Sequence, residues 1–424
     1  MTFQHGLSGL NIATSNLDVV GNNVANANTV GFKQSIAQFS DVFANSLEGS
    51  ANSQIGIGAK ISSIAQQFDQ GGITSTNNPL DIAITGQGFY RLSDNGAISY
   101  SRNGQFHVDK SGFIVDASGA NLTGFVADED GVIRTSGVPA NLKFSTSDVS
   151  PKETTKFDMG FNLDAGKPGI SKAFNATDPS TYTWTTSGSV VDSLGNSHVL
   201  SVFFQKSATA NNWTTYATVD GKVDSSGMPV GVTLGGSPSQ PIVFDGNGKL
   251  LTIATATAAP LDLQIDFSAI NPALGAVTPQ TVRLDMTTAT QYGAASGITD
   301  ITQDGYTSGR MAGFTISPDG IILGNYSNSQ TKTLGQIVLA NFVNPQGLTP
   351  TGDGRWVETL ASGEPLVGTP KTGSLGVLQS NAVENSNVDL TAELVKLIQA
   401  QRMYQANAKQ IEAQDEIIQT IARI

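Results

Sequence analysis

The chain has 424 residues, more than one compact domain usually contains, so two or three domains are expected. Charged residues make up only 14% of it, and Gly, Ser, Thr and Asn supply much of the polar surface. The formal net charge of -12 opposes binding to a phosphate backbone, which argues against a nucleic-acid partner. The chain has no cysteine, which excludes disulfides, thiolate catalysis and sulfur-ligated metals.

The first residues, from Met1 to Gly9, contain neither a basic region nor an apolar core of the kind found in signal peptides. No stretch reaches the roughly 18 consecutive apolar residues of a membrane span. We therefore expect neither a cleaved Sec signal nor a membrane span. If the protein leaves the cell, it should use another export route.

A first helix is expected from about Leu7 to Ala27, because apolar residues recur there at seven-residue intervals. One row of the repeat contains Phe3, Leu10, Leu17 and Val24, and the adjoining row contains Gly6, Ala13, Val20 and Ala27. Asp18 is the only formally charged side chain between Met1 and Phe32. A single partner helix covers only one stripe of such a helix, so we expect other copies of the chain to cover the rest.

The segment 30–72 then connects this helix to a region whose sequence is typical of β-strands and turns. It is too long for an ordinary loop, and the sequence leaves open whether it is an ordered connector or a folded extension. Beyond it, short β-branched and aromatic runs alternate with turn sequences such as Ser93–Gly96, which predict antiparallel hairpins. We predict a first β domain formed by 73–144 and 286–375. The Thr-, Ser-, Ala- and Gly-rich segment 145–285 is predicted to be an inserted outer β domain.

The most regular helical pattern runs from Asn387 to Ile424, with an N-cap candidate in Asn385–Asn387 and Glu393 in the first turns. Two rows of this helix and two of the first form the candidate polymerisation interface, which consists of Leu10, Leu17, Val20, Val24, Leu390, Leu394, Leu397, Tyr404, Ile411 and Ile418. The predicted fold is multidomain, with a coiled-coil-like helical core domain from 1–29 and 376–424 and two mainly antiparallel β domains nested in the middle. The alternative is that both helices pack against each other within one monomer.

No catalytic, cofactor or metal site is predicted. The only histidines, His5, His107 and His198, are not spaced for a metal site, and no phosphate-binding loop or nucleophile elbow occurs. Gly86-Gln87-Gly88 lacks the third glycine of a dinucleotide fingerprint. Asp128-Glu129-Asp130-Gly131 lacks the spaced ligands of a calcium loop, so a hairpin turn is the better interpretation.

The segment from Leu17 to Lys33 resembles the signature shared by flagellar rod and hook proteins. The residues that carry this resemblance are Asn22, Asn23, Ala25, Asn26, Thr29, Gly31, Phe32 and Lys33. Further blocks resemble the same family, namely Asn78–Tyr90, Ser101–Phe106, Gly335–Phe342, Glu384–Leu390 and Ala400–Ala408.

The resemblance implies a non-enzymatic subunit that polymerises into a tube, with the terminal helices as inner core and the β domains outward. It also implies export unfolded through the flagellar type III apparatus to an extracellular position, without a cofactor. Partners implied are other copies of the chain, a hook-capping protein, the distal rod protein and the hook-filament junction protein. The large middle domain favours a hook subunit, which transmits torque as a flexible joint, over the shorter rod proteins. A distal rod protein and a secreted β-rich adhesin are the alternatives.

Overall fold

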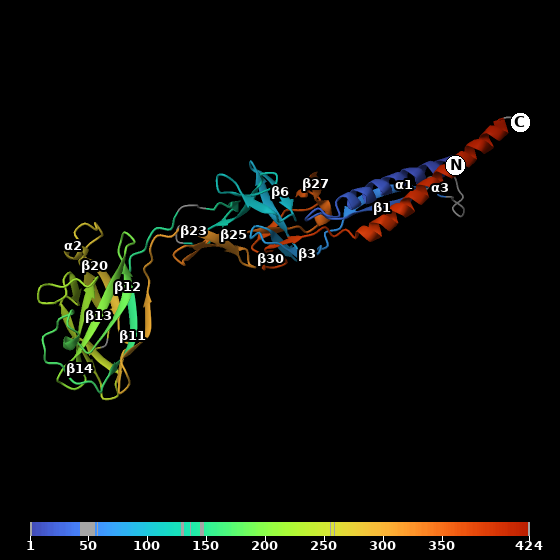
Figure 1. The fold of residues 1–424 in the computed structure, drawn as a ribbon. Coiled ribbons are helices and arrows are strands. Elements are labelled where there is room, and N and C mark those ends of the chain that lie inside the picture. The colour runs from blue at the N-terminus through green and yellow to red at the C-terminus, as the bar shows by residue number, and fades with distance from the viewer. Residues whose placement is uncertain are drawn as a thin grey trace. The chain divides into compact units, whose positions relative to one another are not determined.

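The computed structural model describes residues 2–42, 56, 58–128, 131–135, 137–144, 148–254, 256–257 and 259–422 (Figure 1). The chain divides into two compact units. Unit 1 comprises Met1–Thr146, Gly313–Asn325 and Thr331–Ile424, and unit 2 comprises Ser147–Ala312 and Tyr326–Gln330. Among the described residues, no helix combines the length and the apolar character needed to cross a membrane.

Two long helices dominate one end of unit 1. Helix α1 (Thr2–Ala25) and helix α3 (Leu390–Ala422) lie side by side in antiparallel directions (Figure 1). Gly6 near the start of α1 lies against Ile411, and Asn23 near its end bonds Glu393. The small-residue row predicted for α1 faces this seam, since Ala13 is fully buried. Both terminal helices are confirmed, and their pairing within one chain is the arrangement found.

The start of α3 differs slightly from the expected N-cap. The carboxylate of Asp389 accepts hydrogen bonds from the backbone N–H groups of Thr391 (2.9 Å) and Ala392 (3.2 Å). Asp389 is therefore the N-cap, because an Asp side chain satisfies N–H groups that have no partner within the helix. The predicted cap at Asn385–Asn387 is wrong by a few residues. Asn387 instead bonds other segments.

A β-hairpin covers a second side of α1. Strands β1 (Ser35–Val42) and β2 (Gly58–Gln66) pair antiparallel and pack on the helix. The Asn23 side chain bonds both the N–H and the C=O of Ser35, at 2.9 and 2.8 Å. The described part of the connector is thus a folded hairpin, while 43–55 and 57 lie outside the described residues. This corrects the expectation that other copies alone could cover the uncharged sides of α1.

The rest of unit 1 is β structure around a 13-stranded sheet. The strands of that sheet are β5 (Phe89–Asp94), β6 (Ala97–Ser101), β7 (Phe106–Val108), β8 (Ile114–Asp116), β9 (Asn121–Val126), β10 (Ala140–Asn141), β23 (Met311–Ile316), β24 (Ile321–Tyr326), β25 (Thr331–Ile337), β26 (Leu339–Asn341), β27 (Thr349–Gly352), β28 (Arg355–Val357) and β29 (Leu366–Gly368). Two further pairs, β3 (Ile73–Ser75) with β31 (Ala382–Glu384) and β4 (Ile82–Thr85) with β30 (Val377–Ser380), join the two halves of the chain. A 3-10 turn, Pro345–Gly347, precedes β27. The predicted turn at Ser93–Gly96 links β5 to β6, where Asn95 and Gly96 both have positive φ.

Unit 2 contains two six-stranded sheets that share one apolar core. The first contains β11 (Lys156–Asp164), β15 (Val232–Leu234), β19 (Leu261–Ile265), β20 (Gln280–Asp285), β21 (Thr290–Tyr292) and β22 (Gly297–Gln303). The second contains β12 (Trp184–Val191), β13 (Ser197–Lys206), β14 (Asn212–Val219), β16 (Ser239–Phe244), β17 (Leu250–Ile253) and β18 (Ala256–Thr257). A 3-10 turn, Pro179–Thr181, and the short helix α2 (Phe267–Ile270) complete the unit.

The predicted fold class is confirmed by these elements. Pairing is antiparallel nearly throughout, with parallel exceptions where β11 meets β20 and β21. Strands β21 and β22 lie past residue 285 in the sequence and pair with β11 of unit 2.

Unit 2 carries a carboxylate with a strongly shifted pKa. Asp304 accepts bonds from the N–H groups of Thr155 (2.8 Å) and Lys156 (2.9 Å) and pairs with Lys152 at 3.0 Å. Burial disfavours its charged form, but these partners and the Thr155 hydroxyl outweigh burial, so the pKa of Asp304 lies well below its ordinary value.

We expect unit 2 to lose stability in acid partly through this group. The unfolded chain takes up the proton near pH 4 and the folded chain at lower pH, so the stabilisation is complete above about pH 4 and is lost as the pH falls further. Asp304→Asn should flatten the dependence of the unit 2 melting temperature on pH in this acid range. Asp300→Asn, at an exposed position of β22, is the matched control. Equal pH dependence in the two variants would contradict the assignment.

Candidate assembly surface and junction

The predicted interface residues fall into a covered and an exposed group. Val20 is buried, and Leu10, Leu17, Val24, Leu397 and Ile411 are half-buried. Leu390, Leu394, Tyr404 and Ile418 are exposed. The covered group stabilises the α1–α3 pair of a single chain, whereas the exposed group remains available to a partner.

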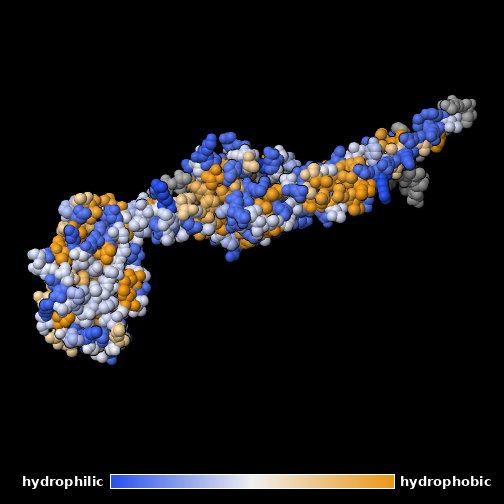
Figure 2. Space-filling model, in the orientation of Figure 1, coloured by the Kyte–Doolittle hydropathy of each residue, from blue (hydrophilic) through white to orange (hydrophobic). Residues whose placement is uncertain are grey.

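Helix α3 exposes more apolar side chains than the heptad rows indicated. Val395, Ile398, Met403 and Ile417 are between 49% and 58% exposed, a large fraction for such residues. Leu390, Leu394 and Ile398 follow one another at four-residue spacing and form one stripe, the outer stripe of α3. Apolar surface gathers on the helical end of unit 1 in Figure 2. The spacing of four was the signal in the sequence, because the heptad rows contain Leu390 and Leu394 but not Ile398.

Helix α3 also extends beyond α1 (Figure 1). Gly6 lies against Ile411 and Gly9 lies against Asn407, so the start of α1 is level with about Asp415. The described end of α3 beyond this point is called the tip. Its Ile417 and Ile418 are each 58% exposed.

The segment that follows α1 forms a buried ionic network, called the junction. Lys33 Nζ donates to Glu384 Oε1 at 2.6 Å and to the carbonyl of Asp69 at 2.8 Å. Arg102 lies 3.3 Å from the other oxygen of Glu384, and the three charged side chains are 0–3% exposed. Burial lowers the pKa of Lys33 and of Arg102, and Glu384 opposes that shift. The carboxylate thus stabilises two buried cations.

A second buried carboxylate, that of Glu393, connects the start of α3 to the end of α1 and to the segment that follows it. Glu393 accepts bonds from Asn23 Nδ2 (3.0 Å), Gln34 Nε2 (2.7 Å) and Lys396 Nζ (2.6 Å). Asn387 accepts the N–H of Gln34 at 2.8 Å. Hydrogen bonds accepted by Glu384, Asn387 and Glu393 therefore hold this part of the chain to the residues that follow α1.

Gly31 shows why the signature contains glycine at this position. Its φ is +72°, and its N–H donates to the carbonyl of Glu384 at 2.7 Å. A Cβ atom there would lie 2.6 Å from the backbone nitrogen of Asn103, so only glycine fits. Sequence reasoning quoted Arg102 and Glu384 as parts of family blocks but gave neither a role.

The other signature residues form the end of α1 and the turn after it. Asn26 Nδ2 donates to the side chain of Asn22 at 2.9 Å, and the Thr29 hydroxyl donates to Asn26 Oδ1 at 3.1 Å. Ala25 is exposed and Phe32 is half-buried. These bonds satisfy backbone and side-chain groups where the helix stops.

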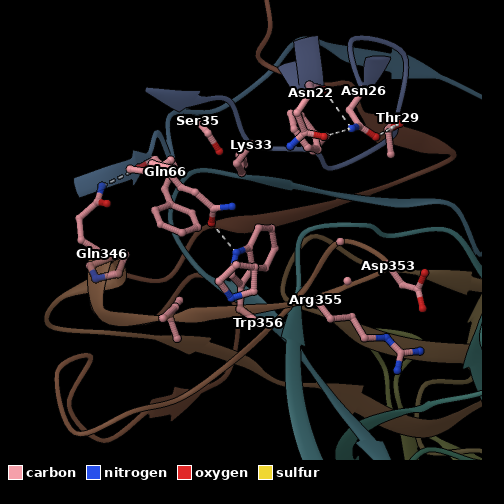
Figure 3. Close-up of a pocket in the computed structure, with 18 residues that line it drawn as sticks. Asn22, Asn26, Thr29, Lys33, Ser35, Gln66, Gln346, Asp353, Arg355 and Trp356 are labelled. Atoms are coloured by element: carbon pink, nitrogen blue, oxygen red, sulfur yellow. Dashed lines mark hydrogen bonds between the residues drawn. The ribbon is translucent and has the colours of Figure 1, made fainter. Parts of the chain in front are cut away.

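A cavity of about 690 Å³ lies beside the junction (Figure 3) and is called the junction pocket. Its lining comes from the end of α1, from β2 and from the residues around β27 and β28, including Asn26, Phe32, Ile64, Phe68, Gln346, Leu348 and Trp356. Trp356 Nε1 donates to Gln66 Oε1 at 2.5 Å, which fixes the indole. The lining also includes the charged residues Lys33, Asp353 and Arg355.

The remaining titratable cluster of note is in unit 2. His198 Nδ1 bonds Asp220 at 2.7 Å, and its Nε2 lies 3.4 Å from Asp192. The two carboxylates bind opposite nitrogens of the ring, so they do not converge on a common ion. Within the described ranges, no group of three His, Asp or Glu side chains is arranged to hold a metal.

Comparisons with known proteins agree along the chain. Family models match in order: flagella basal body rod protein at 3–33, flagellar hook protein FlgE/F/G D1 domain at 83–150, flagellar basal body protein FlaE D2 domain at 162–306, and flagellar basal body rod FlgEFG protein C-terminal at 379–424.

Full-length relatives give the same result. The chain is 40% identical to flagellar hook protein FlgE of Escherichia coli K12 and 39% identical to that of Salmonella typhimurium LT2, with 100% of both chains covered in each case. The Borreliella burgdorferi hook protein is 33% identical, with 99% of this chain and 98% of the relative covered. The crystal structure of Helicobacter pylori flagellar hook protein FlgE2 covers 74% of this chain and 100% of its own, with a TM-score of 0.50 and 13% identity. That likeness concerns the fold alone.

Proposed function

The chain belongs to the flagellar hook protein family, and from this premise we propose that it is the structural subunit of a bacterial flagellar hook. It assembles with its own copies into a flexible tube that transmits torque from rod to filament, and it is not an enzyme. The observation that carries the proposal is identity across the whole chain, including the large middle domain. A shorter rod protein without this domain would not match along the full length of this chain.

The apolar surface of α3 supports assembly through the helical ends. Burial of one Leu or Ile side chain contributes about 1.5–3 kcal/mol, so covering the outer stripe would stabilise a contact between copies substantially. Leu390, Leu394, Tyr404 and Ile418 would make such contacts directly. Val20, Leu397 and the other covered members of the predicted interface act indirectly, because they keep α1 and α3 paired.

The domain division and the partners are part of the same proposal. The inner core consists of α1 and α3, which lie within the predicted segments 1–29 and 376–424, and the β domains lie outward. The first part of the second segment instead forms β30 and β31, which pair with β4 and β3. The pairing of β21 and β22 with β11 supports an outer domain that extends past residue 285. Export through the flagellar type III apparatus to the cell exterior, and contacts with the capping, distal rod and junction proteins, follow from membership of the family.

Deletion of the gene tests the proposal. We expect basal bodies that lack hooks, and we expect re-expression of the chain to restore curved, flexible tubes seen by electron microscopy. Straight, rigid tubes would identify a distal rod protein instead. Intact hooks together with a loss of surface attachment would identify an adhesin and refute the proposal.

A further inference from the structure

We propose that the tip of α3 from one copy binds in the junction pocket of a second copy, so that subunits join head to tail. This inference rests on the proposed function, since it specifies one contact of the hook polymer. Ile417 and Ile418 are the apolar side chains that enter the contact. Phe32, Leu348 and Trp356 belong to the surface that receives them.

The first argument is the continuity of the helical seam. Leu397, Tyr404, Ile411 and Ile418 occupy one row of α3 at seven-residue spacing. Ile411 lies against Gly6 at the start of α1, whereas Ile418 comes after α1 has ended and is 58% exposed. The row that packs against α1 therefore continues past the start of α1, and among the described residues Ile418 of this row remains exposed. A second copy can extend the seam with the same chemistry.

The second argument is the composition of the junction pocket. Trp356 and Leu348 are nearly buried, at 3% and 7% exposed, whereas Ile64 is 54% exposed and offers apolar surface in the lining. Figure 3 places Asn22 and Asn26 on one side and Gln346 on another. Amide groups at these positions can bond Gln419 and Thr420 of an incoming helix, while the apolar lining takes the Ile side chains.

The third argument is distance, which requires a second copy. The pocket lies near the first residues of α3 and the tip lies at its last, and a helix of 33 residues is about 50 Å long. The tip cannot reach the pocket of its own chain. A contact between two different patches of one chain is heterologous, so it yields a filament with a repeat of about 50 Å along this contact unless its rotation closes a ring.

Cysteine crosslinking tests the contact, because the native chain contains no cysteine. The full-length chain carrying Ile418→Cys and Gln346→Cys is assembled into hooks, oxidised, and separated by non-reducing electrophoresis. We expect a ladder of covalent oligomers. The matched control combines Ile418→Cys with Val138→Cys, an 88% exposed position of the first β domain, and should give monomer only.

The outcomes separate this inference from the proposed function. Tubes in which Ile418→Cys and Gln346→Cys cannot be joined, even by a short bismaleimide linker, would overturn the inference and leave the function standing. A ladder from Leu47→Cys with Gln346→Cys would overturn it too, by assigning the pocket to the 43–55 segment of a neighbour. If the double variant does not assemble, the two single variants are each diluted into native chains, and covalent dimers are expected only where both are present. Failure of the native chain to form tubes would refute the function itself.

Discussion

A chain that carries Glu384→Gln should lose about 3–5 kcal/mol of the free energy of unfolding of unit 1, the usual cost of leaving buried charges without their partner. The Glu384 side chain is fully buried between Lys33 and Arg102, whose side chains are 0% and 3% exposed. The amide has nearly the same shape as the carboxylate, so the loss reports the missing charge. Urea unfolding of the full-length monomer, followed separately for the two units, measures it.

Control variants distinguish the loss of a buried charge from the general effect of a Glu→Gln substitution in unit 1. Glu364→Gln lies in unit 1 but is exposed, so it should change stability by no more than about 0.5 kcal/mol. Unit 2 should unfold unchanged in both variants. Adding Lys33→Met to Glu384→Gln removes one of the orphaned cations and should recover part of the loss. No recovery, or equal stability of Glu384→Gln and Glu364→Gln, would show that the network contributes little.

The junction has a mechanical consequence for the proposed function. Glu384 and Glu393 connect the end of α1, the residues that lead into the hairpin, and the start of α3 through charged hydrogen bonds. Such bonds are roughly twice as strong as neutral ones. We expect torque applied at the helical pair to reach the first β domain through a stiff connection. We expect the bending of the tube to occur at other contacts.

The helices and hairpins could be predicted from the sequence because their signals are local. Apolar residues recur at heptad spacing along α1 and α3, which identifies both as helices, and Asn95-Gly96 fits the turn between β5 and β6. The positions of these helices and turns can therefore be predicted from residues that are close together in the sequence.

The junction could not be predicted because its partners are distant in the sequence. Lys33 and Glu384 are 351 residues apart, and Asn23 and Glu393 are 370 apart. Glu393 was expected only to favour the helix dipole, yet it is 1% exposed and accepts three bonds. The hairpin of β1 and β2 lacks a strong alternating pattern, so its packing on α1 had no local signal. Without knowledge of its partners, a charged residue in a sequence is expected to be exposed to solvent, so the burial of Lys33, Glu384 and Glu393 was not predicted.

The seam and the outer stripe of α3 should respond differently to an introduced charge. Leu17 and Leu397, both half-buried, belong to the seam, so Leu17→Asp or Leu397→Asp should block assembly and also loosen the pairing of α1 with α3. Because both effects would occur together, such a result would not reveal which face of α3 contacts other copies. Ile398 is 49% exposed and lies on the outer stripe. Its substitution can separate the two effects.

We expect Ile398→Asp to abolish tube formation and leave the monomer folded. The charge is solvated in the free subunit, where a surface change usually alters stability by less than about 0.5 kcal/mol. In the polymer it would be buried against apolar side chains without a partner, at a cost of several kcal/mol at every contact. Sedimentation and circular dichroism measure the two outcomes. Gln410→Asp, at an exposed position about 120° around α3 from Ile398, introduces the same charge and should still assemble. Tubes formed by Ile398→Asp would exclude the outer stripe from the interface and leave the tip and the other exposed residues of α3, such as Met403 and Tyr404, as candidate contacts.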